Sequence, residues 1–336
     1  MEEQRTVIEA TDLTIGYRRG RVSNKVQEKL NLSLFSGELT CLLGANGTGK
    51  STLLRTLSAS QPSLGGELLL LGKPITSYTE KERSKMIGIV LTDKTFAGGL
   101  TVYEVVALGR QPHTGFFGRL HREDRLLINH AVEAVGISHK VRSYFSELSD
   151  GERQKVMIAK ALVQECPLIV LDEPTAFLDV VSRIEIMALL HQLAVERHKA
   201  ILLSTHDIEQ ALVSGDKLWL LSKRGLECGV TEDLILNHQM DTLFERCDIR
   251  FDYDHGIYYP MAKGKKAILV ESDDKILRHW VFNALNRHGF VCVDRDRSDR
   301  KPLPCLKAVD RQHLLLSRNG ETATFHSFQQ LLAALT

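Results

Sequence analysis

One eight-residue stretch constrains the fold of this chain more than any other, and it reads Gly44-Ala45-Asn46-Gly47-Thr48-Gly49-Lys50-Ser51. An apolar run at 39–43 leads into it and a helix-like run at 51–57 leads out, so the glycines fall at a strand-to-helix turn. Glycine permits close backbone approach, and the N–H groups of a helix N-terminus attract an anion. In this pattern the lysine reaches the β- and γ-phosphates and the serine holds Mg²⁺. The stretch predicts a nucleoside triphosphate site, and the alternative is a glycine-rich turn that binds nothing.

The whole-chain composition narrows the class of protein. A length of 336 residues allows two domains or one large domain with an appendage, and 43% hydrophobic with 25% charged residues is typical of a globular protein. The net charge of +1 gives no indication of a nucleic-acid partner. No apolar run approaches the roughly 20 residues that span a bilayer, so we expect any membrane role to be through a partner. The N-terminus lacks a secretory signal and the 6 cysteines lack C-x-x-C spacing, which favours a cytoplasmic protein with reduced thiols.

The segments around the loop predict an α/β core with additions. Residues 6–17 and 30–43 are β-rich and are expected to form an antiparallel region before the loop, and 87–91 is another strand candidate. Apolar spacing at 101–109 and 123–135 is helical, which indicates a helical insertion. Tyr17 lies in the first β segment, where its ring either stacks on a base or simply packs.

Two further positions follow short buried strands. The run 168–171 ends in Asp172 and Glu173, and the run 200–204 leads to His206. Ligands bind at the carboxyl ends of parallel strands, so Asp172 is a candidate for Mg²⁺ and Glu173 for orienting or deprotonating water. The alternatives are a solvated acidic turn and a packed or capping histidine.

The segment 146–152 precedes a helix-like run at 153–163. Ser149 and Asp150 stand where N-caps are common, which is the simpler interpretation. The same geometry offers a second helix N-terminus to a phosphate.

The order of these pieces, from about Val7 to Leu236, resembles the nucleotide-binding subunit of an ATP-binding-cassette (ABC) transporter. The resemblance rests on the phosphate loop, the signature-like Leu148-Ser149-Asp150-Gly151-Glu152, the pair Asp172-Glu173, Leu178-Asp179 and His206. It implies a P-loop NTPase cassette with a RecA-like core, an antiparallel β subdomain and a helical subdomain. It also implies an ATPase that forms a homodimer, in which two chains sandwich two ATP molecules head to tail.

The resemblance assigns roles residue by residue. Catalysis falls to Glu173, His206 and Lys50, and Mg²⁺ to Ser51, Asp172 and Thr92. Nucleotide contacts fall to Tyr17, Gly44, Asn46, Gly47, Gly49, Lys50, Ser51, Thr52 and, across the dimer, Ser149, Gly151, Glu152 and Asp179.

Three positions depart from the family pattern. Asp150 and Glu152 replace a glycine and the glutamine of LSGGQ, and Thr92 stands where a glutamine is usual. We expect the first two to weaken ATP affinity and the third to alter the coupling to hydrolysis.

The segment 100–113 is similar to that of ATPases that serve importers of iron–siderophore, haem or vitamin B12. That similarity implies permease subunits as partners, an extracytoplasmic substrate-binding protein as an indirect one, and a place on the cytoplasmic face of the inner (plasma) membrane. The alternatives are a soluble ABC-type ATPase and a nucleotide switch without a permease.

The resemblance ends before the C-terminal region. We therefore expect an ABC ATPase domain at 1–260 and a small α/β domain at 264–336, which contains a βαβ unit, a hairpin and a final helix. No catalytic constellation is evident there, so a dimerising or stabilising appendage is the simplest interpretation and a regulatory domain the alternative.

Overall fold

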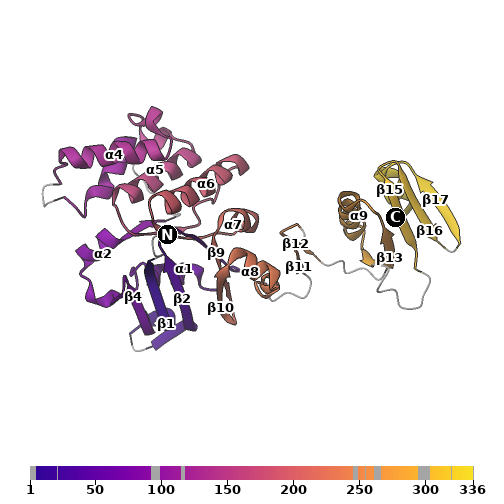
Figure 1. Ribbon diagram of the computed structural model, residues 1–336, viewed down its shortest axis with the longest axis horizontal. Coiled ribbons are helices and arrows are strands. Elements are labelled where there is room, and N and C mark those ends of the chain that lie inside the picture. Colours follow the sequence, from indigo (N-terminus) through magenta and orange to yellow (C-terminus); the bar gives the residue numbers. More distant parts are fainter. Residues whose placement is uncertain are drawn as a thin grey trace. The chain divides into compact units, whose positions relative to one another are not determined.

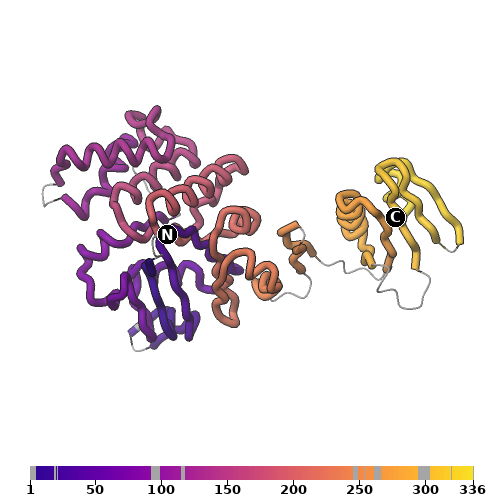
Figure 2. The backbone as a smooth tube through the Cα atoms, in the orientation of Figure 1, coloured from indigo at the N-terminus to yellow at the C-terminus, as the bar shows by residue number. Residues whose placement is uncertain are grey.

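The computed structural model describes residues 5–20, 22–91, 99–114, 118–244, 249–253, 255–260, 266–293, 303–318 and 320–335. The chain forms two compact units. The first runs to residue 245 and includes Tyr253–Ile257, and the second takes in 246–252 and 258–336. The backbone of each can be followed in Figure 2.

An antiparallel sheet opens the first unit. Alternating residues of its first strand, such as Ile8 and Ala10, are buried, so one face of the strand packs on the core. The strands lie in the order β2-β1-β4-β5, with β1 (Thr6–Arg19), β2 (Val22–Phe35), β4 (Gly65–Leu70) and β5 (Lys73–Pro74). This confirms the predicted antiparallel region, although its second strand begins earlier than the expected residue 30.

The assignment of 30–43 to that region is wrong for its last part. Leu39–Leu43 forms β3, which pairs in parallel with strands of a second sheet. All five of its residues are buried, because strands on both sides and layers above and below cover it. The break at Ser36-Gly37 is therefore a change of sheet.

The second sheet has six strands and a parallel centre. Its order is β10-β9-β3-β8-β7-β6, with β10 (Gly225–Val230), β9 (Lys217–Ser222), β8 (Ala200–Ser204), β7 (Leu168–Asp172) and β6 (Ile87–Val90). Only β10 pairs antiparallel with its neighbour. Because β3, β7 and β8 run parallel, the residues that follow them lie together at the carboxyl ends of these strands. The phosphate loop, the acid pair and His206 all follow those strands.

The helices of the first unit divide into two groups. Figure 1 shows α4 and α5 at one end of the unit and the antiparallel strands β1, β2 and β4 at the opposite end. The helical end contains α3 (Val102–Ala107), α4 (Arg122–Ala134) and α5 (Asp150–Val163), with 3-10 turns η2 (Leu108–Arg110), η3 (Ser138–Lys140) and η4 (Phe145–Glu147). The remaining helices are α1 (Lys50–Leu57), η1 (Ile75–Ser77), α2 (Glu80–Met86), α6 (Val180–Glu196), α7 (Ile208–Ser214), α8 (Thr231–Leu236) and η5 (Gln239–Thr242).

The second unit is a small α/β fold. Its sheet has the order β14-β13-β15-β16-β17, and β13 pairs in parallel with both neighbours. The elements are β13 (Lys266–Glu271), α9 (Lys275–Arg287), β14 (Phe290–Val293), β15 (Cys305–Asp310), β16 (His313–Arg318), β17 (Glu321–Phe325) and α10 (Phe328–Leu335). The predicted βαβ unit and hairpin are present, and β15 is an additional strand between them. A two-stranded sheet, β11 (Ile249–Asp252) and β12 (Ile257–Pro260), precedes them in the chain.

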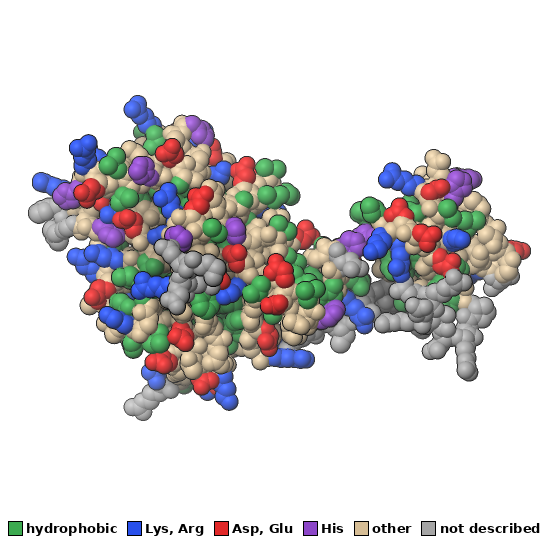
Figure 3. Space-filling view, in the orientation of Figure 1, with side chains coloured by type: hydrophobic (Ala, Val, Ile, Leu, Met, Phe, Trp, Pro, Cys, Tyr) green, Lys and Arg blue, Asp and Glu red, His purple; other side chains and the backbone are tan. Residues whose placement is uncertain are grey.

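The visible surface carries charges of both signs. Figure 3 shows lysine and arginine interspersed with aspartate and glutamate on the face of the first unit that it draws. None of the described helices is both long and apolar enough to cross a bilayer.

Candidate functional site

The phosphate loop turns tightly between β3 and α1. Gly47 has φ 80° and Gly49 has φ 108°, both in the left-handed region that favours glycine. A Cβ added at Gly49 would lie 2.6 Å from Val26 Cγ1, so a side chain there is excluded by space as well as by angle. The loop therefore needs glycine at this position, which is the N-cap of α1.

Lys50 folds back over the loop. Its Nζ donates to the carbonyl of Gly44 at 2.7 Å and lies 3.4 Å from that of Ala45. Burial lowers the pKa of Lys50, while the carboxylates of Glu173 and Asp172 act in the opposite direction. The cation thus lies within electrostatic reach of the acid pair at the same edge of the sheet.

A buried glutamine, which the sequence analysis missed, supports the loop from behind. Gln27 Nε2 donates to the carbonyl of Thr48 at 3.0 Å and to that of Ser222 at 2.8 Å. It therefore ties β2 and the end of β9 to the phosphate loop. In the sequence, Gln27 is only an amide side chain within a β segment, and this gives no indication that it bonds to a carbonyl as distant as that of Ser222.

The acid pair is oriented by the neighbouring strand. Ser204 Oγ donates to Asp172 Oδ1 at 2.6 Å and lies 3.0 Å from the Glu173 N–H, which donates to it. Glu173 has φ 48°, an unusual backbone angle for a non-glycine residue. Ser204 was predicted only as a strand end, so its orienting role is new.

His206 lies between the acid pair and the lysine. Its Nε2 is 2.8 Å from Glu173 Oε1 and 3.4 Å from Lys50 Nζ. An ionised carboxylate only accepts and an ammonium only donates, so Nε2 carries a proton toward Glu173 and makes no hydrogen bond with Lys50. His206 therefore lies within contact of both other predicted catalytic side chains, Glu173 and Lys50.

Tyr17 lies beside the start of α1. Its hydroxyl is 2.8 Å from Thr52 Oγ1. The ring lines a hollow of about 750 Å³, whose other walls come from the β1–β2 hairpin and residues 61–64. An aromatic ring at the edge of such a hollow offers a flat face to a base.

The signature-like segment caps α5. Glu152 N–H donates to Ser149 Oγ at 3.3 Å, and Ser149 N–H donates to Glu152 Oε2 at 2.9 Å. This is a capping box, which satisfies two N–H groups that the helix leaves unpaired. The helix begins at Asp150, three residues before the expected start at 153.

Gly151 and Asp179 lie on either side of one serine. A Cβ at Gly151 would lie 3.1 Å from Ser182 Oγ, and that hydroxyl donates to Asp179 Oδ2 at 2.8 Å. The N-termini of α5 and α6 are therefore adjacent. The hydrogen bonds described for Ser149 and Glu152 stay within residues near the start of α5, and none of them reaches the phosphate loop of the same chain.

Ser51 and Thr92 are two further residues predicted for the Mg²⁺ site. Ser51 lies exposed in the first turn of α1. Thr92 lies outside the described residues.

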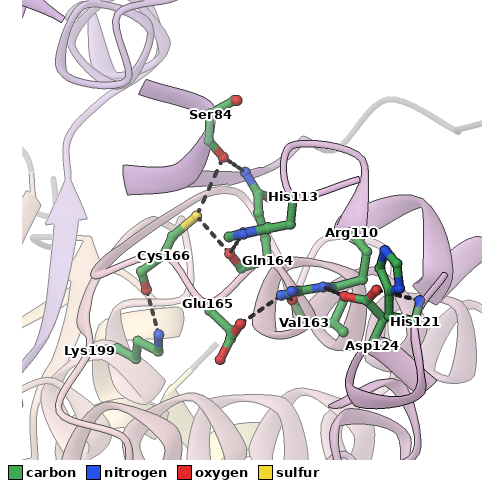
Figure 4. A network of polar contacts seen from close by, with 10 residues as sticks. All are labelled: Ser84, Arg110, His113, His121, Asp124, Val163, Gln164, Glu165, Cys166 and Lys199. Atoms are coloured by element: carbon green, nitrogen blue, oxygen red, sulfur yellow. Dashed lines mark hydrogen bonds and ion pairs between the residues drawn. The ribbon is translucent and has the colours of Figure 1, made fainter. Parts of the chain in front are cut away.

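The segment after α3 is held by a network of polar contacts, drawn in Figure 4. Arg110 Nε donates to Asp124 Oδ1 at 2.8 Å, and its Nη1 donates to Val163 O at 2.8 Å and Glu165 Oε2 at 2.7 Å. His113 Nε2 lies 2.9 Å from the Gln164 carbonyl. The side chains of Arg110 and His113 therefore brace the end of α5.

Comparison with known proteins agrees with this geometry. Residues 27–176 match the family described as ABC transporter. An uncharacterised ABC transporter ATP-binding protein of Methanocaldococcus jannaschii is 38% identical over 285 residues, 82% of this chain and 97% of that protein. The iron(3+)-hydroxamate import ATP-binding protein FhuC of Bacillus subtilis is 41% identical over 186 residues, 55% of this chain and 69% of FhuC.

The fold also agrees with that of solved ABC transporter cassettes. The dimeric structure of the bacterial ABC transporter cassette MJ0796 matches with a TM-score of 0.58 and 26% identity, and the match covers 67% of this chain and 98% of that one. These matches confirm the predicted cassette fold and ATPase activity. The phosphate loop, acid pair and histidine lie at one edge of the sheet in this cassette fold, and the chain belongs to the family of ABC transporter ATP-binding proteins.

Proposed function

We propose that this ATPase powers a membrane importer of iron–siderophore complexes or a related metal chelate. The relative FhuC carries iron(3+)-hydroxamate import in its name, and its similarity spans 69% of FhuC. The partners are then permease subunits, with an extracytoplasmic binding protein acting through them, and the chain works at the cytoplasmic face of the membrane. The observation that carries the ATPase chemistry is the contact of His206 with Glu173 at 2.8 Å beside Lys50.

The donor set near the loop fits Mg²⁺. Ser51 offers a hydroxyl and Asp172 a carboxylate, and such oxygen ligands suit this hard cation. Ser204 donates to Asp172 Oδ1 at 2.6 Å and so orients this carboxylate at the end of β7. The ion would neutralise charge on the β- and γ-phosphates, and Thr92 is proposed to act near it.

The protein side chains have separable tasks. Lys50 exchanges its carbonyl partners for phosphate oxygens, while loop N–H groups from Gly44 to Gly49 and the Thr52 hydroxyl hold the phosphates. His206 turns its Nε2–H from Glu173 to the γ-phosphate. The freed Glu173 carboxylate then accepts a proton from the attacking water. Tyr17 stacks on the adenine.

The site needs two copies of the chain. Ser149, Gly151 and Glu152 form a helix N-terminus that makes no contact with the phosphate loop of its own chain among the described hydrogen bonds. We assign it, with Asp179 next to it, to the nucleotide held by a second copy. The dimeric cassette MJ0796 of similar fold supports this arrangement. Loss of the γ-phosphate on hydrolysis then separates the two chains and moves the permease.

The second unit is proposed as an accessory domain. Its separate core supports the proposed division into an ATPase domain at 1–260 and an accessory domain at 264–336, although residues 246–252 and 258–260 cluster with the second unit. Eleven buried residues, from Ile268 to Leu331, form that core. A dimerising or stabilising role is the simplest proposal for it, and a regulatory role is the alternative.

ATP turnover of the purified chain beside Glu173→Gln tests the catalytic assignment. We expect turnover at least 100-fold lower in the variant with ATP binding retained, because the amide cannot accept the proton. Wild-type turnover no higher than that of the variant would instead favour a nucleotide switch. Co-purification of a permease from membranes separates an importer subunit from a soluble ATPase.

A further inference from the structure

The start of α5 carries two carboxylates, Asp150 and Glu152, at the place where the proposed function puts the second copy's nucleotide. A triphosphate carries several negative charges, so an uncompensated carboxylate at a desolvated interface would repel it. The structure shows where each of these charges is directed.

Both oxygens of Glu152 face groups of its own chain. Oε2 accepts from the Ser149 N–H at 2.9 Å, and Oε1 lies 3.7 Å from Lys140 Nζ. The hydrogen bond from the Ser149 N–H, with Lys140 and His139 adding to it, holds the pKa of Glu152 below its usual value. Glu152 is therefore ionised, and its charge is balanced within one chain.

Asp150 has its own cation. Arg153 Nη1 lies 3.3 Å from Asp150 Oδ1, and Arg153 Nη2 donates to the Ser146 carbonyl at 2.8 Å. Each acid at this helix start is thus paired with a base from the same subdomain.

The capping box also fixes the Ser149 side chain. Its Oγ accepts from the Glu152 N–H at 3.3 Å, and its hydroxyl donates to the Glu152 carboxylate, which helps to lower the pKa of Glu152. The cap therefore holds Ser149 at the N-terminus of α5, where a phosphate is attracted.

We propose that Glu152 and Lys140 form a positioning pair for the composite ATP site. Glu152 caps α5 and holds the Ser149 side chain and the helix N-terminus in place for the phosphates that the second copy binds. Lys140 cancels the charge with which Glu152 would repel them. Glu152 itself does not contact the nucleotide, which revises its expected role as a nucleotide-binding residue. The pair rests on the two-copy site proposed above.

ATP-dependent dimerisation of Glu173→Gln chains tests the pair, because hydrolysis is then slow. Light scattering measures the ATP concentration that gives half-maximal dimer. In this background we expect Lys140→Met to raise that concentration about threefold, since exposed ion pairs contribute about 0.2–1 kcal/mol. Adding Glu152→Gln to Lys140→Met restores the parent value, because a neutral amide still accepts from Ser149 N–H and no longer repels phosphate.

The matched control is Lys155→Met, which removes a lysine of α5 that pairs with Glu185 at 2.7 Å. It is expected to leave the half-maximal concentration unchanged. The proposed pair is overturned if Lys140→Met leaves the half-maximal ATP concentration unchanged. It is also overturned if the double variant needs a higher ATP concentration than Lys140→Met alone. A parent that binds ATP and never dimerises shows that the two-copy site itself is wrong, and the pair is rejected with it.

Discussion

Replacing Arg110 with methionine should loosen the helical subdomain. Arg110 is 7% exposed and Asp124 is 6% exposed, so the change leaves a buried carboxylate without its cation and the Val163 carbonyl without one donor. Breaking a buried pair costs about 3–5 kcal/mol, and the lower end applies because His121 N–H still donates to Asp124 Oδ2 at 2.8 Å. About 3 kcal/mol corresponds to roughly a 150-fold change in an opening equilibrium.

Hydrogen exchange of the α4 amides measures that opening directly. We expect α4 to exchange about 100-fold faster in Arg110→Met, with the β3 amides much less affected. Glu165→Gln is the control, because Glu165 is half exposed and its ion pair contributes at most about 1 kcal/mol. Adding Asp124→Asn should recover much of the loss, since a neutral amide costs less to bury unpaired. Exchange in Arg110→Met within about fivefold of the wild type would refute the reasoning.

Three further outcomes are expected. Burial raises the pKa of the Asp124 carboxyl, but hydrogen bonds from His121 N–H and Arg110 outweigh burial, so the net pKa is lowered. The hydrogen-exchange protection of the α4 amides should therefore be full above about pH 4, the usual carboxyl range. It should fall at lower pH, as Asp124 is protonated. Tyr17→Phe should keep ATP affinity within about threefold and Tyr17→Ala weaken it about tenfold by calorimetry, because base stacking contributes about 1–3 kcal/mol; equal losses would contradict stacking. Removing residues 264–336 should leave ATP binding intact, and its loss would refute a site confined to the first unit.

Motif order in the sequence was sufficient for the cassette fold. The phosphate loop and the acid pair depend on short local runs, in which an apolar strand ends at a polar residue. Such strands place their ends at one edge whenever they run parallel, so the gathering of Lys50, Glu173 and His206 was predictable. The limit of the antiparallel region was missed, although β3 is a mostly apolar run with all five residues buried, whereas exposed residues interrupt the buried ones in β2.

The sequence by itself determined which residues are proposed to carry the chemistry, since the motifs that contain Lys50, Asp172, Glu173 and His206 lie within short segments. The tertiary structure alone decided what holds them. Gln27 bonds to the Ser222 carbonyl 195 positions away, and Ser204 orients an aspartate from a neighbouring strand. Glu152 likewise turned out to cap its own helix beside Lys140. Packing between distant segments of the chain determines partners of this kind, so the local sequence pattern does not predict them.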